Sequence, residues 1–209
     1  MPASLAQGRY GYGLMGGTFD PIHYGHLVTA EEARVEFGLK KVVFIPSGRP
    51  PHKEERPITP AQHRYIMTSL AVATNPFFEV SRVEVDRPGY SYTYETVKHF
   101  RELIGAEAEI FFITGADALL EILTWRNIDD LMSSCQFIGA TRPGYGIQEL
   151  NGFQAGLKPE YRSRIHLLEV PALAISSTDI RRRVKSGRSI KYLVPEAVER
   201  YIISNRLYV

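Results

Sequence analysis

The sequence is poor in the features that mark secreted and membrane proteins. Its one cysteine, Cys135, excludes an intramolecular disulfide and a cysteine-based zinc site. The longest apolar runs, such as 42–45 and 110–113, fall far short of the roughly 20 residues that cross a membrane. Residues 1–7 lack the basic and then apolar pattern of a signal peptide. These absences predict a cytoplasmic protein with no membrane partner.

An excess of one charge is also missing. Lys and Arg number 25, Asp and Glu 23, and the net charge is +2, which gives no reason to expect a nucleic-acid partner. Repeats and low-complexity tracts are absent, and 44% of the 209 residues are hydrophobic. This composition predicts a single folded domain over 1–209, in which 1–9 form a short N-terminal extension. It leaves open whether the chain forms a homo-oligomer.

Short buried strands alternate with helices along the chain. Such alternation is typical of βαβ units and of a parallel sheet covered on both faces. We therefore expect an α/β fold, a Rossmann-like doubly wound parallel sheet with helices on both faces and a small C-terminal helical portion. The expected strands are the segment ending at 14–17, then 41–45, 109–114, 136–141 and 165–168, with 77–85 extended. The expected helices are 24–37, 60–73, 93–104, 176–185 and 195–204, and a further helix opens at 115–117.

Residues 11–16 match the dinucleotide-binding pattern G-x-G-x-x-G, but their context argues against that function. The pattern must follow a strand and open a helix. Residues 5–10 make a poor buried strand, and the next helix begins well after Gly16. The match therefore does not support a nicotinamide-dependent oxidoreductase.

The more informative segment runs from Gly16 to His26 and reads GGTFDPIHYGH. Paired glycines at the end of a strand let a ligand approach the backbone closely. His23 and His26 are three residues apart at the start of a helix, so they share a face near free N–H groups and the positive end of the helix dipole. The segment predicts a polyphosphate-binding site.

A second helix start carries hydroxyl groups and an arginine. Ser176, Ser177 and Thr178 precede an apolar-periodic helix, and Asp179 stands in the third position of a capping box. These residues are also what a well-capped structural helix needs. Arg181 is unfavourable in a first helical turn unless an anion lies nearby, which favours a phosphate site.

The two motifs, His23-Tyr24-Gly25-His26 and the ISSTxxR-like segment 175–181, resemble those of the nucleotidyltransferase α/β-phosphodiesterase superfamily. Within it, the chain resembles bacterial nicotinate-nucleotide adenylyltransferases from Gly16 to the C-terminal helix. The further motifs that carry this resemblance are the PPHK loop at 50–53, the S-Y-T-x-x-T segment at 91–96, and Gly115-Ala116-Asp117 followed by Trp125.

The resemblance implies that the protein joins ATP to nicotinate mononucleotide and releases pyrophosphate, as a step of NAD biosynthesis. It implies Mg²⁺ carried mainly by substrate phosphates, with no metal-binding residues in the protein. The implied catalytic residues are His23, His26 and Arg181. The implied ATP-binding residues are Gly16, Gly17, Thr18, Phe19, His23, His26, Gly115, Asp117, Ser176, Ser177, Thr178 and Arg181, and the implied mononucleotide-binding residues are Thr18, Lys53, Thr93, Trp125 and Arg126.

Other interpretations remain open at the level of sequence. Asp117 can serve as an acid at a helix start, Lys53 as a surface lysine and Trp125 as a core residue. The rival enzymes are a phosphopantetheine adenylyltransferase and a polyol-phosphate cytidylyltransferase, both of which lack the Trp125 feature. A non-enzymatic nucleotide-binding module is a third alternative, against which the intact His23, His26 and Arg181 argue.

Overall fold

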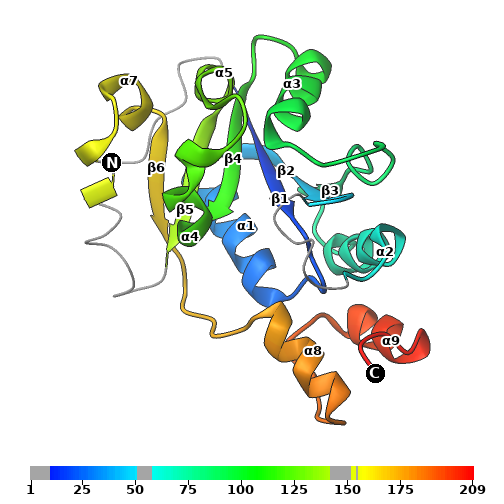
Figure 1. Ribbon diagram of the computed structural model, residues 1–209. Coiled ribbons are helices and arrows are strands. Elements are labelled where there is room, and N and C mark those ends of the chain that lie inside the picture. Colours follow the sequence, from blue (N-terminus) through cyan, green and yellow to red (C-terminus); the bar gives the residue numbers. More distant parts are fainter. Residues whose placement is uncertain (1–9, 51–57, 142–151, 154) are drawn as a thin grey trace. The chain divides into compact units, whose positions relative to one another are not determined.

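The structure is a computed structural model that describes residues 10–50, 58–141, 152–153 and 155–209 (Figure 1). The expected N-terminal extension and Lys53 lie outside these ranges. Within the described ranges, none of the helices combines the length and the apolar composition that a membrane crossing requires.

The strands form one six-stranded parallel sheet in the order β3-β2-β1-β4-β5-β6. This order is doubly wound, because the chain moves outward from β1 to one edge and then from β4 to the other, as the sequence predicted. The strands are β1 (Gly11–Gly17), β2 (Leu39–Pro46), β3 (Phe78–Val80), β4 (Glu109–Gly115), β5 (Gln136–Thr141) and β6 (Ile165–Glu169).

The long helices match the sequence prediction closely. They are α1 (Tyr24–Glu36), α2 (Ala61–Val72), α3 (Thr93–Ile104), α8 (Ser177–Lys185) and α9 (Glu196–Ser204). The helix expected to open at 115–117 is present as α4 (Ala116–Leu120). The structure adds short elements that the sequence analysis missed: η1 (Ile122–Thr124), α5 (Ile128–Ser134) and α7 (Pro159–Arg162). It also shortens the extended segment expected at 77–85 to the three residues of β3. The G-x-G-x-x-G pattern lies inside β1, which confirms that it is not a dinucleotide-binding turn.

The described residues divide into two compact units. The first unit comprises the described parts of 10–16, 29–43 and 92–172, and the second those of 17–28, 44–91 and 173–209. The prediction of one domain over 1–209 stays a prediction.

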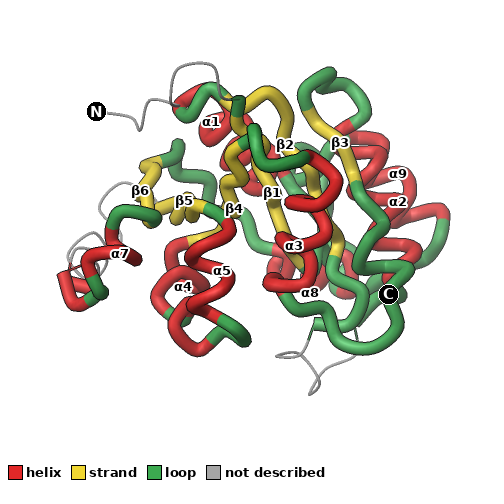
Figure 2. Tube along the Cα trace, turned by 90° about the horizontal axis from the view of Figure 1, so that it is seen from above, coloured by secondary structure: helices red, strands yellow, loops and turns green. Residues whose placement is uncertain are grey.

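The first unit is built on the parallel pairs β1–β4, β4–β5 and β5–β6. Figure 2 shows the Thr29–Glu36 part of α1 on one face of these strands and α3, α4 and α5 on the other. Leu14, Ile113 and Phe137 are fully buried in its core. The carboxyl end of β4 leads into the segment that holds Gly115, Asp117 and Trp125.

The second unit contains the β1–α1 turn, β3, α2, α8 and α9. Helix α2 packs against both β3 and α9. On its inner face lie Arg64, Met67, Thr68, Ala71 and Val72, at the spacing of a helix with one buried side. One of these buried residues, Arg64, carries a charge.

Candidate active site

The turn between β1 and α1 has a strained backbone at Phe19. Its φ is 49°, in the left-handed region that a bulky residue rarely adopts. The Phe19 ring is buried and packs edge-on against His26, with ring centroids 5.1 Å apart, and against Phe44 at 5.9 Å. A Cβ on Gly17 would lie 2.8 Å from this ring, so glycine is required there. The conformation therefore depends on its surroundings, as is common at functional sites.

His23 and His26 form a stacked pair at the start of α1. Their ring centroids are 3.8 Å apart, and the planes differ by 27°. The backbone N–H of His23 donates to Nδ1 of His26 at 3.2 Å. A nitrogen that accepts a hydrogen bond carries no proton, so this contact selects the neutral tautomer with its proton on Nε2. His26 is thereby set up as a donor.

Gly25 has a packing role that the sequence did not reveal. In the structure, a Cβ at this position would lie 3.0 Å from both Cε1 and Nδ1 of His23. Glycine therefore lets the imidazole of His23 fold back against its own helix start.

The start of α8 meets the same turn. Ser176 caps the helix by accepting the N–H of Asp179 at 3.1 Å, which confirms the serine half of the predicted capping box. Ser177 donates from Oγ to the carbonyl oxygen of Pro21 at 2.8 Å. Arg181 donates from Nη1 to the carbonyl oxygen of Asp20 at 2.6 Å, and from Nη2 to Oγ1 of Thr178 at 3.1 Å. Two side chains near the start of α8, Ser177 and Arg181, thus join the helix to the segment between β1 and α1.

Charge is concentrated at this helix. Arg182 and Arg183 both donate to the carboxylate of Asp179, at 2.5 and 2.6 Å. These hydrogen bonds lower the pKa of Asp179, which keeps it ionised. Arg181 donates to no carboxylate among the described residues and keeps N–H groups that the two contacts above do not use. It is the cation of this helix that is suited to an incoming phosphate.

The first unit holds the other predicted residues. Trp125 is half-buried and packs edge-on against Phe112 and Phe137, with ring centroids 5.8 and 6.5 Å apart. The guanidinium of Arg126 lies 4.7 Å from the centre of the Tyr92 ring, and Tyr92 directly precedes Thr93 at the start of α3. The structure therefore brings Arg126 close to the segment that carries Thr93.

Gly115 and Asp117 stand where β4 ends and α4 begins. Both are exposed. This is the carboxyl end of a parallel strand, the edge at which open α/β sheets bind ligands. Asp117 is also the acid in the first turn of α4, so both roles considered for it remain compatible with its position.

Comparisons with known proteins identify the family. A family model described as cytidylyltransferase-like matches residues 14–183. A protein of Moorella thermoacetica named "Probable nicotinate-nucleotide adenylyltransferase" is 64% identical over 196 residues, which cover 94% of this chain and 90% of the relative. A protein of the same name from Thermoanaerobacter sp. is 57% identical over 196 residues, 94% of this chain and 93% of the relative. The chain belongs to the nicotinate-nucleotide adenylyltransferases.

A solved structure supports the fold of this adenylyltransferase. The nicotinic acid mononucleotide adenylyltransferase of Plasmodium falciparum, complexed with NaAD, matches it with a TM-score of 0.77. The match covers 96% of this chain and 98% of the other at 20% identity. At that identity, the likeness confirms the Rossmann-like architecture expected from the sequence.

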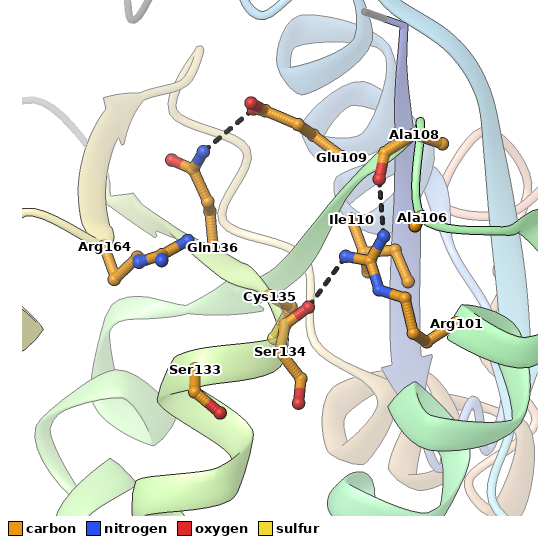
Figure 3. A pocket seen from close by; sticks show the side chains of 10 residues that line it. All are labelled: Arg101, Ala106, Ala108, Glu109, Ile110, Ser133, Ser134, Cys135, Gln136 and Arg164. Atoms are coloured by element: carbon orange, nitrogen blue, oxygen red, sulfur yellow. Dashed lines mark hydrogen bonds between the residues drawn. The ribbon is translucent and has the colours of Figure 1, made fainter.

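A polar pocket of about 410 Å³ lies at the opposite, amino-terminal edge of the strands of the first unit (Figure 3). Arg101 lines this pocket and donates to the carbonyl oxygens of Ala108 at 2.5 Å and Ser134 at 2.8 Å. Gln136 donates to Glu109 at 2.9 Å. The side chains of Arg101 and Gln136 thus already bond to other residues of the lining. None of the lining residues is a predicted site residue. Its lining is Arg101, Ala106, Ala108, Glu109, Ile110, Ser133, Ser134, Cys135, Gln136 and Arg164.

The structure thus groups the predicted residues of this adenylyltransferase by unit. The second unit brings together the turn, the two histidines and the start of α8, whereas the first holds Trp125, Arg126, Thr93, Gly115 and Asp117. Sequence reasoning missed three residues at the turn: Asp20, Arg64 and Tyr208. One signal was available, because Arg64 falls at helical spacing with the apolar face of α2.

Proposed function

We propose that the protein transfers the adenylyl group of ATP to nicotinate mononucleotide. A phosphate oxygen of the mononucleotide attacks the α-phosphorus of ATP. The bond between that phosphorus and the oxygen bridging to the β-phosphate breaks, so the products are nicotinate adenine dinucleotide and pyrophosphate. The attacking phosphate is already ionised near neutral pH, so the reaction needs charge stabilisation and alignment more than a general base.

One observation carries the phosphate side of this proposal. The stacked pair of His23 and His26 and the start of α8 both attach to the Thr18–Pro21 turn. Together they offer imidazole, hydroxyl, guanidinium and backbone N–H donors. We propose that His23, His26, Ser176, Ser177, Thr178 and Arg181 bind the ATP phosphates, with backbone N–H groups of Gly16, Gly17, Thr18 and Phe19.

The remaining roles follow from the first unit and the family. We propose that Trp125 stacks on the pyridine ring, because a flat heteroaromatic ring on indole is a favourable contact. Thr93 and the backbone N–H of Arg126 would hold the pyridine carboxylate. Gly115 and Asp117 would contact the adenosine ribose, since a carboxylate can accept from both ribose hydroxyls. Lys53, outside the described residues, keeps its proposed role toward the mononucleotide.

Mg²⁺ enters this proposal with the substrate. Among the described residues, no group of three or more His, Cys, Asp or Glu side chains is arranged to hold a metal ion. Mg²⁺ usually keeps several waters and binds through substrate phosphates in nucleotide-using enzymes. We therefore treat MgATP as the substrate. Both substrates are small soluble anions, so a cytoplasmic location, without nucleic-acid or membrane partners, is part of the same proposal.

The test is pyrophosphate release with each acceptor in turn. Purified protein receives MgATP or MgCTP together with nicotinate mononucleotide, phosphopantetheine or glycerol 3-phosphate. The proposal expects release only with ATP and nicotinate mononucleotide, and formation of the dinucleotide. Release with CTP, or with either other acceptor alone, would assign the chain to one of the rival activities. The His26→Ala variant, purified in parallel, controls for contaminating enzymes.

A further inference from the structure

We propose that Arg64 and Tyr208 are positioning residues of the adenylyl transfer. Neither is among the residues to which the resemblance assigns a role. Each reaches the Thr18–Pro21 turn from a distant part of the second unit, Arg64 from α2 and Tyr208 from the segment after α9. The inference rests on the proposed function only in taking this turn as the phosphate-binding element.

Arg64 holds the turn through its backbone. The side chain is 1% exposed. Within the described part of the chain, its hydrogen bonds go to backbone carbonyl oxygens. It donates to Thr18 at 2.8 Å, to Thr59 at 2.8 Å and to Gly48 at 3.0 Å. Burial lowers the pKa of Arg64, which expresses the cost of keeping this charge out of water. The planar guanidinium is suited to this task, because its donors point to three segments at once.

Tyr208 holds the turn through a side chain. Its phenol donates to Oδ1 of Asp20 at 2.8 Å, while the N–H of Thr59 donates to Oδ2 at 3.4 Å. Asp20 is only 5% exposed. Burial and the neighbouring Asp20 raise the pKa of Tyr208, so the phenol stays protonated and remains a donor. Loss of this donor would leave the buried carboxyl group of Asp20 with one hydrogen-bond partner fewer.

These contacts fix the strained residue from both sides. Phe19 has its left-handed backbone between two carbonyl groups, and each accepts from an arginine: Thr18 from Arg64, and Asp20 from Arg181. A left-handed bulky residue persists only where its surroundings enforce it. Without the anchors, the turn can relax, and the N–H groups beside Phe19 would no longer point where the phosphates bind. Displacements of about 1 Å at such a site cost on the order of 100-fold in rate.

The chain offers a matched control for Tyr208. Tyr201 on α9 also lies in the second unit, and its phenolic oxygen lies 2.8 Å from Nδ1 of His63 on α2. That bond joins two helices and does not touch the turn. Comparing Tyr208→Phe with Tyr201→Phe therefore separates loss of a tyrosine hydrogen bond from loss of the anchor on Asp20.

The experiment measures ATP binding by calorimetry, steady-state kcat and KM, and the urea midpoint for both variants. We expect Tyr208→Phe to weaken ATP binding and lower kcat, together on the order of 10- to 100-fold in kcat/KM for ATP, with mononucleotide binding unchanged. Tyr201→Phe should match wild type in all kinetic values. Both variants should shift the urea midpoint by similar small amounts.

Arg64→Lys provides a second, independent arm. Lysine keeps the charge but cannot serve three carbonyl oxygens with fixed geometry, so it should lower kcat/KM for ATP while the protein stays folded by circular dichroism. If Tyr208→Phe and Tyr201→Phe behave alike, or if Arg64→Lys keeps wild-type kinetics, the positioning role is wrong. If wild type binds ATP but transfers nothing to nicotinate mononucleotide, the proposed function fails, and the ATP-binding data alone decide the positioning role.

Discussion

A hydrogen bond accepted by one nitrogen of an imidazole determines what the other nitrogen can do. In His26, Nδ1 accepts from the backbone of His23, so the neutral ring carries its proton on Nε2. The stacked neighbour and the edge of Phe19 restrict rotation of the ring. A donor fixed before the reaction stabilises developing charge without reorganisation. This is the physical reason for expecting a large effect from a single side chain.

Substitution His26→Ala should therefore lower kcat by about 100-fold or more. The free energy of unfolding should change little, because His26 is only half-buried. Turnover is measured by pyrophosphate release, and stability by urea titration. His63→Ala is the control: it removes a half-buried histidine of α2 whose hydrogen bond goes to Tyr201. A His26 variant with turnover within a few-fold of wild type would exclude a role in charge stabilisation.

A second prediction at the residue scale concerns Arg181, whose proposed role is to bind ATP. We expect Arg181→Ala to raise the KM for ATP more than that for the mononucleotide, because the guanidinium lies beside the hydroxyl-rich start of α8 and donates to no carboxylate among the described residues. Its bond to the Asp20 carbonyl adds a smaller loss in kcat. Arg182→Ala is the matched control, since Arg182 is exposed and bonds to Asp179. Superimposable ATP titrations of wild type and Arg181→Ala would reduce Arg181 to a surface charge.

The site residues that the sequence revealed are those that act within one local segment. The histidines three apart and the hydroxyls before α8 are visible as spacing. Arg64 and Tyr208 are not, because their contacts join residues 46 and 188 positions apart. Nothing in the local pattern around Tyr208 indicates that its phenol meets Asp20. Such anchors become visible only when the chain is folded.

At the scale of elements, local signals again decided what could be predicted. Helix α3 and strand β5 begin and end where the sequence placed them, because amphipathic spacing with Gly105 and a run of apolar residues define them. Helices α5 and α7 were not predicted, because seven and four residues are too few to show a helical periodicity. Strand β3 is shorter than expected because the chain turns within 82–89, where bends replace the extended backbone.

A polar connection across three strands leads to a prediction on pH. Nε2 of His166 on β6 lies 2.5 Å from Oε1 of Gln136 on β5, and Gln136 donates to Glu109 on β4. The rings of Phe37 and Phe111 flank His166. Burial lowers the pKa of His166 below its ordinary 6.5, against a smaller opposite effect of Glu109. The folded state therefore binds this proton less readily than the unfolded chain does.

The sign follows from linkage. When the pKa of a histidine is lower in the folded state than in the unfolded state, the histidine's contribution to the free energy of unfolding is fully present above about pH 6.5. That contribution is lost as the pH falls below this value. We expect the free energy of unfolding to decrease between about pH 7.5 and 5.5, with a slope from this group of at most about 1.4 kcal/mol per pH unit. Urea titrations of wild type and His166→Gln measure it. Equal pH dependence in the two proteins would contradict the assignment to His166.

At the scale of the whole molecule, the acid group of nicotinate has to be recognised against the amide of nicotinamide. In the proposed site, the donors for a carboxylate are the hydroxyl of Thr93 and the backbone N–H of Arg126. The guanidinium of Arg126 lies over Tyr92, beside Thr93. A carboxylate accepts hydrogen bonds at both oxygens, whereas an amide presents its NH₂ to one donor. That mismatch leaves a polar group unsatisfied, at a cost of about 1–3 kcal/mol.

We therefore expect preference for nicotinate mononucleotide over nicotinamide mononucleotide by roughly one to three decades in kcat/KM, at about 1.4 kcal/mol per decade. The measurement compares both mononucleotides at saturating MgATP. Trp125→Ala should weaken both substrates alike, because stacking depends on the ring and not on its substituent, whereas Thr93→Ala should weaken chiefly the acid. Equal kcat/KM values in wild type would contradict acid specificity and leave adenylyl transfer intact. A Thr93→Ala variant that weakened both substrates equally would move the recognition of the carboxylate to Arg126 or Lys53.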